Sequence, residues 1–313
     1  MTNSSSAVSG LIGNTPLIPL RFEDRGITIY AKCEFLNPSG SIKDRLAKTV
    51  IDDAERRGVL RRDSIILECS SGNTGVALAM MGAARGYKVA IVISEKASRE
   101  RLQLIRHLGA EVITFPAGGY GAGIDLTLEM AANDPRYFLP QQFENPLNAA
   151  DHEHVTGPEI LRQFSGRIDA FVSGFGTGGT LAGISRALRG SDPKTQVYAM
   201  EAGAAVLQGE SPCCHFIEGV SDGFVPPLMR GVVLDGSITV SSLDAGRMAQ
   251  KLAQSFGLLV GTSSGANVCA ALTAAERLGP GKNVITMLCD RAERYFSTGL
   301  FAVTQPGGFE FAI

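Results

Sequence analysis

Residues 64–93 read SIILECSSGNTGVALAMMGAARGYKVAIVI, and this stretch decides the fold class. The apolar run Ser64–Cys69 predicts a strand, and small polar residues after it lead into a helical pattern over Thr74–Arg85. After a glycine turn, the apolar run Lys88–Ile93 predicts a second strand. Strand, helix and strand in this order form a βαβ unit, whose two strands lie parallel in one sheet. The stretch therefore predicts an α/β protein with a parallel sheet.

The same alternation of apolar runs and helical patterns continues along the chain. Five more strands are predicted, at Ile27–Glu34, Glu111–Phe115, Ala170–Ser173, Gln196–Met200 and Asn283–Leu288. Seven more helices are predicted, at Ile42–Arg57, Arg99–Leu108, Ile124–Ala132, His152–Phe164, Thr180–Leu188, Ala245–Phe256 and Ala266–Leu278. The 313 residues exceed what one core usually holds, and no hydrophilic linker divides them. We therefore expect two interleaved three-layer α/β/α lobes with mostly parallel sheets.

The composition excludes several classes of function. Lys and Arg number 29 against 31 Asp and Glu, so the formal charge of -2 offers no basic surface for nucleic acid or an anionic membrane. The first ten residues lack the features of a signal peptide, and no apolar run is long enough to span a bilayer. The six cysteines have no CxxC spacing, which favours free thiols in a reducing cytoplasm. The class of function that remains is chemistry on a small molecule.

A polar turn, Asn37–Arg45, joins a predicted strand to a predicted helix. Ser41 and Asp44 have the spacing of a capping box, which places Lys43 in the first helical turn. The helix dipole disfavours a protonated amine there, so we expect a lowered pKa for Lys43, as suits a lysine that forms a Schiff base. The alternative is an ordinary surface lysine whose stem extends towards solvent.

Two further polar segments follow strands and begin helices. Ser70–Gly75 offers backbone N–H groups and hydroxyls to a carboxylate, although a serine-rich helix cap would have the same sequence. Gly174–Thr180 can hold a phosphate through its peptide N–H groups and threonine hydroxyls. It also fits the dinucleotide pattern G-x-G-x-x-G, with Glu201 at a suitable distance, so a dinucleotide site is a rival interpretation.

Two other patterns point to chemistry that the rest of the sequence does not support. Gly261–Gly265 fits the G-x-S-x-G motif of hydrolases, but that fold needs a histidine after the serine, and the last histidine is His215. Ser263 therefore needs another explanation. His152 and His154 are two residues apart and would point to different helix faces, so we predict no metal site.

Six segments, taken in order, resemble the cysteine synthase family: Gly13–Leu17, Asn37–Arg45, Ser71–Gly75, Gln141–Phe143, Thr156–Glu159 and Gly176–Thr180. This family comprises the O-acetylserine sulfhydrylases and their relatives among the fold-type II pyridoxal-phosphate enzymes, which share the tryptophan synthase β-like fold. The resemblance extends over residues 10–301. Cys289–Thr298 resembles the type B branch, whereas His215–Pro226 resembles type A.

The resemblance implies pyridoxal 5'-phosphate as cofactor and a role for each matching residue. Lys43 matches the catalytic Schiff-base lysine. Cofactor contacts are implied for Asn73 at the 3′-oxygen, Ser263 at the pyridine ring, and the phosphate loop Gly176, Thr177, Gly178, Gly179 and Thr180. Substrate contacts are implied for Ser70, Ser71, Asn73, Thr74 and Gln142, for Gly219 and Ser221 in a closing loop, and for Cys289 in the acceptor pocket. Asp290 is an alternative contact for the ring nitrogen.

The implied organisation is an N-terminal arm (1–12), a smaller, mobile lobe that grips substrate (42–150), and a larger lobe that binds the cofactor phosphate (13–41 and 151–313). The implied reaction is β-replacement on O-acetyl-L-serine by sulfide, giving L-cysteine and acetate through an α-aminoacrylate, in a cytoplasmic homodimer. One alternative is an O-phosphoserine-dependent cysteine synthase or a diaminopropionate-precursor synthase. Alternatives of a different class are a dinucleotide-binding oxidoreductase and a catalytically inactive regulatory homologue.

Overall fold

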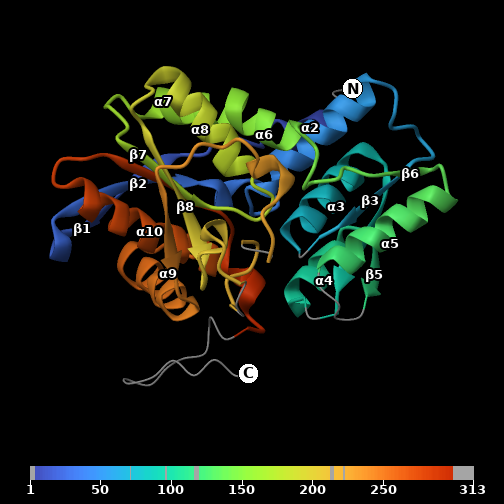
Figure 1. Cartoon of the computed structure of the whole chain (residues 1–313). Coiled ribbons are helices and arrows are strands. Elements are labelled where there is room, and N and C mark those ends of the chain that lie inside the picture. The colour runs from blue at the N-terminus through green and yellow to red at the C-terminus, as the bar shows by residue number, and fades with distance from the viewer. Residues whose placement is uncertain are drawn as a thin grey trace.

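The computed structural model describes residues 4–70, 72–95, 97–115, 120–211, 215–220 and 223–298. Within these ranges the chain forms two sheets, each covered by helices on both faces (Figure 1). The mixed α/β class with mostly parallel sheets is confirmed. Across the same ranges, no helix combines the length and hydrophobicity that a membrane crossing requires.

The larger sheet has six strands in the order β1-β2-β10-β7-β8-β9. Their bounds are Leu17–Phe22, Ile27–Cys33, Val284–Leu288, Ala170–Gly174, Gln196–Ala202 and Gly236–Val240 in that order. Only β1 runs antiparallel, against β2, and the other described pairings are parallel. The inner strands are buried on both faces, which explains why they appear in the sequence as continuous apolar runs.

The smaller sheet has four parallel strands in the order β5-β4-β3-β6. Their bounds are Glu111–Phe115, Lys88–Ser94, Ile65–Cys69 and Tyr137–Phe138 in that order. All four come from residues 65–138, whereas the larger sheet draws strands from both sides of that range. The chain thus starts the larger sheet, builds the smaller one and then returns.

Helices cover each sheet in two layers. Their bounds are Ser4–Ser9 (α1), Lys43–Arg56 (α2), Asn73–Arg85 (α3), Arg99–His107 (α4), Tyr120–Asn133 (α5), Leu147–Asp151 (α6), Gly157–Gln163 (α7), Gly179–Ser191 (α8), Ser242–Phe256 (α9) and Thr262–Leu278 (α10). On the smaller sheet, α2, α3 and α4 pack on one face and α5 on the other. On the larger sheet, α9 and α10 cover one face and α7 and α8 the other.

The helix that precedes β7 departs furthest from its prediction. The helix predicted to begin at His152 begins at Leu147 and contains a π-helical turn over His152–Thr156 before α7. Pro158 is the second residue after this turn, and proline removes an N–H donor and crowds the preceding turn. Widening of the helix there avoids that conflict. The periodicity of apolar residues does not reveal such a turn.

We call each sheet with the helices that cover it a lobe. A buried cluster of four charges fixes the start of α2, in the smaller lobe, against the larger lobe. Arg45 donates to Glu34 and to Glu159, each at 2.7 Å, and Lys32 donates to Glu159 at 2.7 Å. Burial opposes ionisation of Glu159, but Arg45 and Lys32 outweigh it and hold its pKa at about 2. Because Arg45 lies two residues after Lys43, this cluster also fixes where that lysine emerges.

Candidate active site

Lys43 is the first residue of α2 and is half-buried. The capping box expected between Ser41 and Asp44 does not form. The Oγ atom of Ser41 accepts from the N–H of Lys43 at 3.3 Å, and the Asp44 carboxylate accepts instead from the N–H of Ser39 at 2.7 Å. Gly40, with a φ of +91°, turns the chain back so that Ser39 reaches Asp44. The polar turn still begins the helix, with a different set of bonds.

The end of strand β10 holds this turn in place. The N–H of Ile42 donates to the carbonyl of Cys289 at 2.9 Å, and Ser41 forms a β-bridge with Asp290. Lys43 therefore emerges beside the carboxyl end of β10. In open α/β sheets, ligands bind at the carboxyl ends of the strands.

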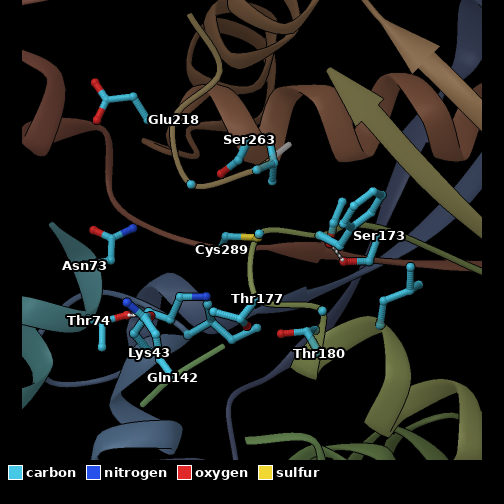
Figure 2. A pocket seen from close by; sticks show the side chains of 18 of the residues that line it. Lys43, Asn73, Thr74, Gln142, Ser173, Thr177, Thr180, Glu218, Ser263 and Cys289 are labelled. Carbon is cyan, nitrogen blue, oxygen red and sulfur yellow. Dashed lines mark hydrogen bonds between the residues drawn. The ribbon is translucent and has the colours of Figure 1, made fainter. Parts of the chain in front are cut away.

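A cavity of about 750 Å³, including the part open to solvent, lies between the two lobes. Figure 2 shows Asn73 and Thr74 on one side, Thr177 and Thr180 on the other, and Lys43 between them. The cavity is lined by most of the residues predicted for the site, namely Lys43, Asn73, Thr74, Gln142, Gly176, Thr177, Gly178, Thr180, Gly219, Ser263 and Cys289. Gly179 lies between two lining residues without lining the cavity itself, and Ser70 is not among the lining residues. Ser71 and Ser221 are outside the described residues.

The glycine loop at the start of α8 forms a cradle with no room for side chains. Gly178 has a φ of +85°, and a Cβ atom there would lie 2.7 Å from Met229 Cγ. A Cβ atom on Gly179 would lie 2.3 Å from Asn148 Oδ1. The N–H groups of a 13-residue helix thus face the cavity without obstruction, as an anion site requires.

We expect Gly178→Ala to weaken binding of a phosphate group at this loop. An alanine held at positive φ costs about 1–2 kcal/mol, which corresponds to roughly tenfold in affinity. Absorbance titration of the cofactor-free protein with pyridoxal phosphate measures this change. Gly190→Ala, near the end of the same helix and facing open space, is the matched control and should bind normally. Equal affinity of the two variants would contradict the assignment.

Two buried side chains support the threonines of this loop. Asn148 donates to Thr177 Oγ1 at 2.9 Å, and His152 Nε2 lies 3.1 Å from Thr180 Oγ1. Burial lowers the pKa of His152 to about 3, so its ring is neutral at physiological pH. In the described part of the chain, no three His, Cys, Asp or Glu side chains could hold a metal ion together. His152 therefore has a structural explanation in its bond to Thr180.

The predicted carboxylate-binding segment lies at the start of α3. Ser70 Oγ accepts from the N–H groups of Gly72 and Gly75, both at 3.0 Å, so this hydroxyl shapes the loop. Gln142 is bonded on both sides: its Nε2 donates to the carbonyl of Cys69 at 2.7 Å, and its Oε1 accepts from Thr74 at 2.6 Å. Gln142 and Thr74 are thereby held as one unit at the cavity wall.

Glu68 is a buried carboxyl group directly behind this unit. It accepts from the N–H groups of Cys69 at 3.0 Å and Gln142 at 3.1 Å, and no cationic side chain among the described residues pairs with it. Burial raises its pKa to about 8. In the unfolded chain the carboxyl group of Glu68 would ionise near pH 4.5. Protonated Glu68 therefore stabilises the fold fully below that pH, and this stabilisation is lost as the pH rises towards 8.

Glu68→Gln should remove this pH dependence. The stability of the variant relative to wild type is expected to rise between pH 4.5 and 8 by at least about 1.4 kcal/mol, the free energy of one pKa unit. Urea unfolding of both proteins at several pH values measures the difference. Parallel stability curves would contradict the raised pKa.

Ser263 and Cys289 lie together on the wall of the cavity where α10 begins and β10 ends. Both side chains line the cavity, and Ser263 lies in the first turn of α10. Burial, with a contribution from Asp290, raises the pKa of the Cys289 thiol to about 12, so it is protonated at neutral pH. Asp290 points elsewhere: its carboxylate accepts from Asn73 Nδ2 at 2.7 Å and from the Tyr295 hydroxyl at 2.8 Å. The geometry favours Ser263 over Asp290 as a contact for a ring nitrogen.

Sequence reasoning missed two charged residues of the cavity, Arg101 and Glu218. Arg101 is buried on α4, lies over the Tyr295 ring with 4.7 Å to its centroid, and pairs with Glu218. Glu218 lies within residues 203–236, where the sequence shows neither helical nor strand periodicity. Only the packing of one lobe against the other brings the two together, so no local pattern could have identified them.

The dinucleotide interpretation of the glycine loop fails at Glu201. This side chain is completely buried, and its Oε2 atom accepts from the N–H of Leu207 at 2.8 Å. A ribose-binding carboxylate must instead face the ligand.

The residues of the cavity fit pyridoxal phosphate. A glycine cradle at a helix N-terminus suits the phosphate, and a lysine amine on the same cavity suits the aldehyde. Asn73 and Ser263, on separate walls, are polar groups suited to the ring substituents. The structure thus supplies a group for each end of the cofactor.

Known proteins share this architecture. A family model described as pyridoxal-phosphate dependent enzyme matches residues 8–290. A cysteine synthase from Staphylococcus aureus is 41% identical over 299 residues, covering 94% of this chain and 96% of the relative. A probable cysteine synthase from Bacillus subtilis is 42% identical over 299 residues, covering 93% and 96%. The crystal structure of an O-acetylserine dependent cystathionine beta-synthase from Helicobacter pylori has a TM-score of 0.90 and 39% identity, covering 96% of this chain and 99% of that one.

Proposed function

The chain belongs to the pyridoxal-phosphate dependent enzymes, and on that basis we propose that it catalyses β-replacement on O-acetyl-L-serine with sulfide, giving L-cysteine and acetate. The observation that carries the proposal is the placement of Lys43, the glycine loop and the Thr74–Gln142 unit around one cavity. Relatives named cysteine synthase that match over nearly the whole chain support the same reaction.

Each part of the cavity has a proposed task. Pyridoxal phosphate, when bound, supplies an electron sink for the bonds at the substrate's Cα. The N–H groups of α8 and the hydroxyls of Thr177 and Thr180 hold its phosphate. The amine of Lys43 tethers the cofactor and, once released by the substrate, removes the Cα proton. The start of α3, with Asn73, Thr74 and Gln142, binds the substrate carboxylate.

The remaining proposed contacts lie around the incoming nucleophile. Ser263 would present a neutral hydroxyl to the ring nitrogen, a contact that suits β-elimination better than more demanding carbanion chemistry. Gly219 contributes to a loop that closes the cavity, and Cys289 lines the side from which the nucleophile arrives. The family resemblance alone extends substrate contacts to Ser71 and Ser221.

The cavity favours an acetyl over a phosphate leaving group. A phosphorylated serine would bring a dianion, which needs a cation of its own. Among the described lining residues the cations are Lys43 and Arg101, and Arg101 already faces Glu218 and, at 3.8 Å, Asp290. An uncharged acetyl group makes no such demand.

Steady-state assays of O-acetylserine and O-phosphoserine with sulfide test the proposal. We expect kcat/KM for O-acetylserine to be higher by roughly tenfold or more, equivalent to 1.4 kcal/mol or more of transition-state stabilisation. A preference for O-phosphoserine would overturn the choice of donor. Absence of cysteine formation from either donor would overturn the reaction.

We also propose that the protein works as a homodimer in the cytoplasm. The family resemblance supports the dimer. The free thiols of Cys33, Cys69, Cys269 and Cys289 support a reducing compartment, while Cys213 and Cys214 lie outside the described residues. Light scattering during gel filtration should give twice the mass of 33.0 kDa per chain.

A further inference from the structure

The side-chain amide of Asn73 is bonded at both ends by residues of the other lobe. Its Nδ2 donates to Asp290 Oδ2 at 2.7 Å, and its Oδ1 accepts from Arg294 Nη1 at 2.5 Å. Asn73 begins α3 of the smaller lobe, whereas Asp290 and Arg294 follow β10 of the larger sheet. These two bonds therefore cross between the lobes at the cavity wall.

The two partners permit only one orientation of that amide. A carboxylate can only accept a hydrogen bond, and a guanidinium can only donate. The amide nitrogen must therefore face Asp290 and the amide oxygen must face Arg294. Rotation by 180° would place oxygen against carboxylate and nitrogen against guanidinium, which breaks both charge-assisted bonds.

The partners are themselves held in place. Asp290 is fully buried and accepts from the Tyr295 hydroxyl at 2.8 Å, with Arg101 at 3.8 Å. Burial, reinforced by Asp290, raises the pKa of Tyr295, which keeps this hydroxyl a donor. Arg294 also donates to the carbonyl of Ser39, in the turn that precedes Lys43. The network thus joins the wall that carries Asn73 to the turn that carries the lysine.

We propose that Asp290 and Arg294 are positioning residues that fix the Asn73 amide so that its second N–H hydrogen points to the 3′-oxygen of the bound cofactor. This inference rests on the proposed function, because it needs pyridoxal phosphate in the cavity. Cofactor and substrate touch neither residue in this account, and both act through Asn73. Asp290, which the sequence left as a rival contact for the ring nitrogen, acquires a different task.

The test measures cofactor affinity and the pH at which the visible band of the bound cofactor changes. Asp290→Ala and Arg294→Met each remove one end of the clamp on Asn73. We expect roughly tenfold or greater loss of affinity for pyridoxal phosphate and a shift of about one pH unit in the band, as for loss of one hydrogen bond to a charged group. Asp290→Asn keeps an acceptor oxygen for Asn73 and Tyr295, and should stay within about twofold of wild type.

A matched control separates positioning from folding. Asp169 is a buried carboxylate just before β7, at the amino end of the parallel strands and thus opposite the end where Asp290 lies, and it is bonded to Lys282 and to the N–H of Asn283. Asp169→Ala should lower the free energy of unfolding and leave the band and its pH profile unchanged. If Asp290→Ala does not fold, the cofactor affinity and the pH profile of the Arg294→Met variant test the inference instead.

Several results would overturn the inference. Wild-type affinity and an unchanged pH profile in Asp290→Ala and Arg294→Met would show that Asn73 needs no clamp. An Asp290→Asn variant as impaired as Asp290→Ala would show that charge, and not the direction of the bond, matters. A wild-type protein that takes up no pyridoxal phosphate would overturn the proposed function together with this inference, whereas normal uptake with unaltered variants overturns the inference alone.

Discussion

Lys43→Ala is expected to abolish the visible absorbance band of the lysine-bound cofactor and to reduce turnover by about a thousandfold or more. The amine is both tether and base in the proposed reaction, and loss of a general base alone typically costs 10²–10⁴-fold. The fold should survive, because Lys43 is a half-buried residue in the first turn of α2 and alanine is a good helix former. Absorbance spectra and cysteine formation from O-acetylserine and sulfide measure the two effects.

Lys48→Ala is the matched control on the same helix. Lys48 is partly exposed and pairs with Asp52 at 2.7 Å, four residues along. Such a pair contributes only about 0.3–0.5 kcal/mol, so this variant should keep both the band and the activity. A Lys43→Ala protein that retained a reducible covalent link to the cofactor would show that another amine carries it.

Arg45→Ala is expected to produce the largest loss of stability. Glu34 and Glu159 lie buried against this guanidinium, and its removal leaves two carboxylates with Lys32 as their one remaining cation in the cluster. Removing one partner of a buried ion pair typically costs about 3–5 kcal/mol, because the other charge stays buried without compensation. Urea unfolding followed by circular dichroism measures this change.

Arg56→Ala, at the other end of α2, provides the comparison. The Arg56 side chain is 73% exposed and pairs with Asp53 on the surface, so its loss should cost less than about 1 kcal/mol. If the two arginine variants were equally stable, the buried cluster would contribute no more than a surface pair. That result would contradict the role of the buried cluster in fixing the start of α2.

The sequence predicts those parts of the fold that local patterns encode. Buried parallel strands such as β4 and β7 are continuous apolar runs, and strong periodicity marks α2 within one residue of its observed bounds. The edge strands β1 and β9 were not predicted, because β1 contains Pro19 and β9 follows an irregular stretch. Element type is a local property here, whereas edge pairing depends on the rest of the sheet.

The candidate site divides in the same way. Glycine loops at helix starts are visible in the sequence because a backbone cradle needs residues without side chains, as Gly178 and Gly179 show. The bonds that orient those residues are not visible. The clamp on Asn73 joins residues 217 and 221 positions away, and the partner of Arg101 lies in an aperiodic loop. Such pairs arise only when the lobes pack together.

The most direct test of the account is a two-step spectrum of the purified protein with pyridoxal phosphate bound. O-Acetylserine alone should replace the visible band with that of a new species and release one acetate per chain. Sulfide added afterwards should restore the original band and release one cysteine per chain. A band that O-acetylserine leaves unchanged, or acetate release without cysteine on addition of sulfide, would contradict β-replacement as the function of this protein.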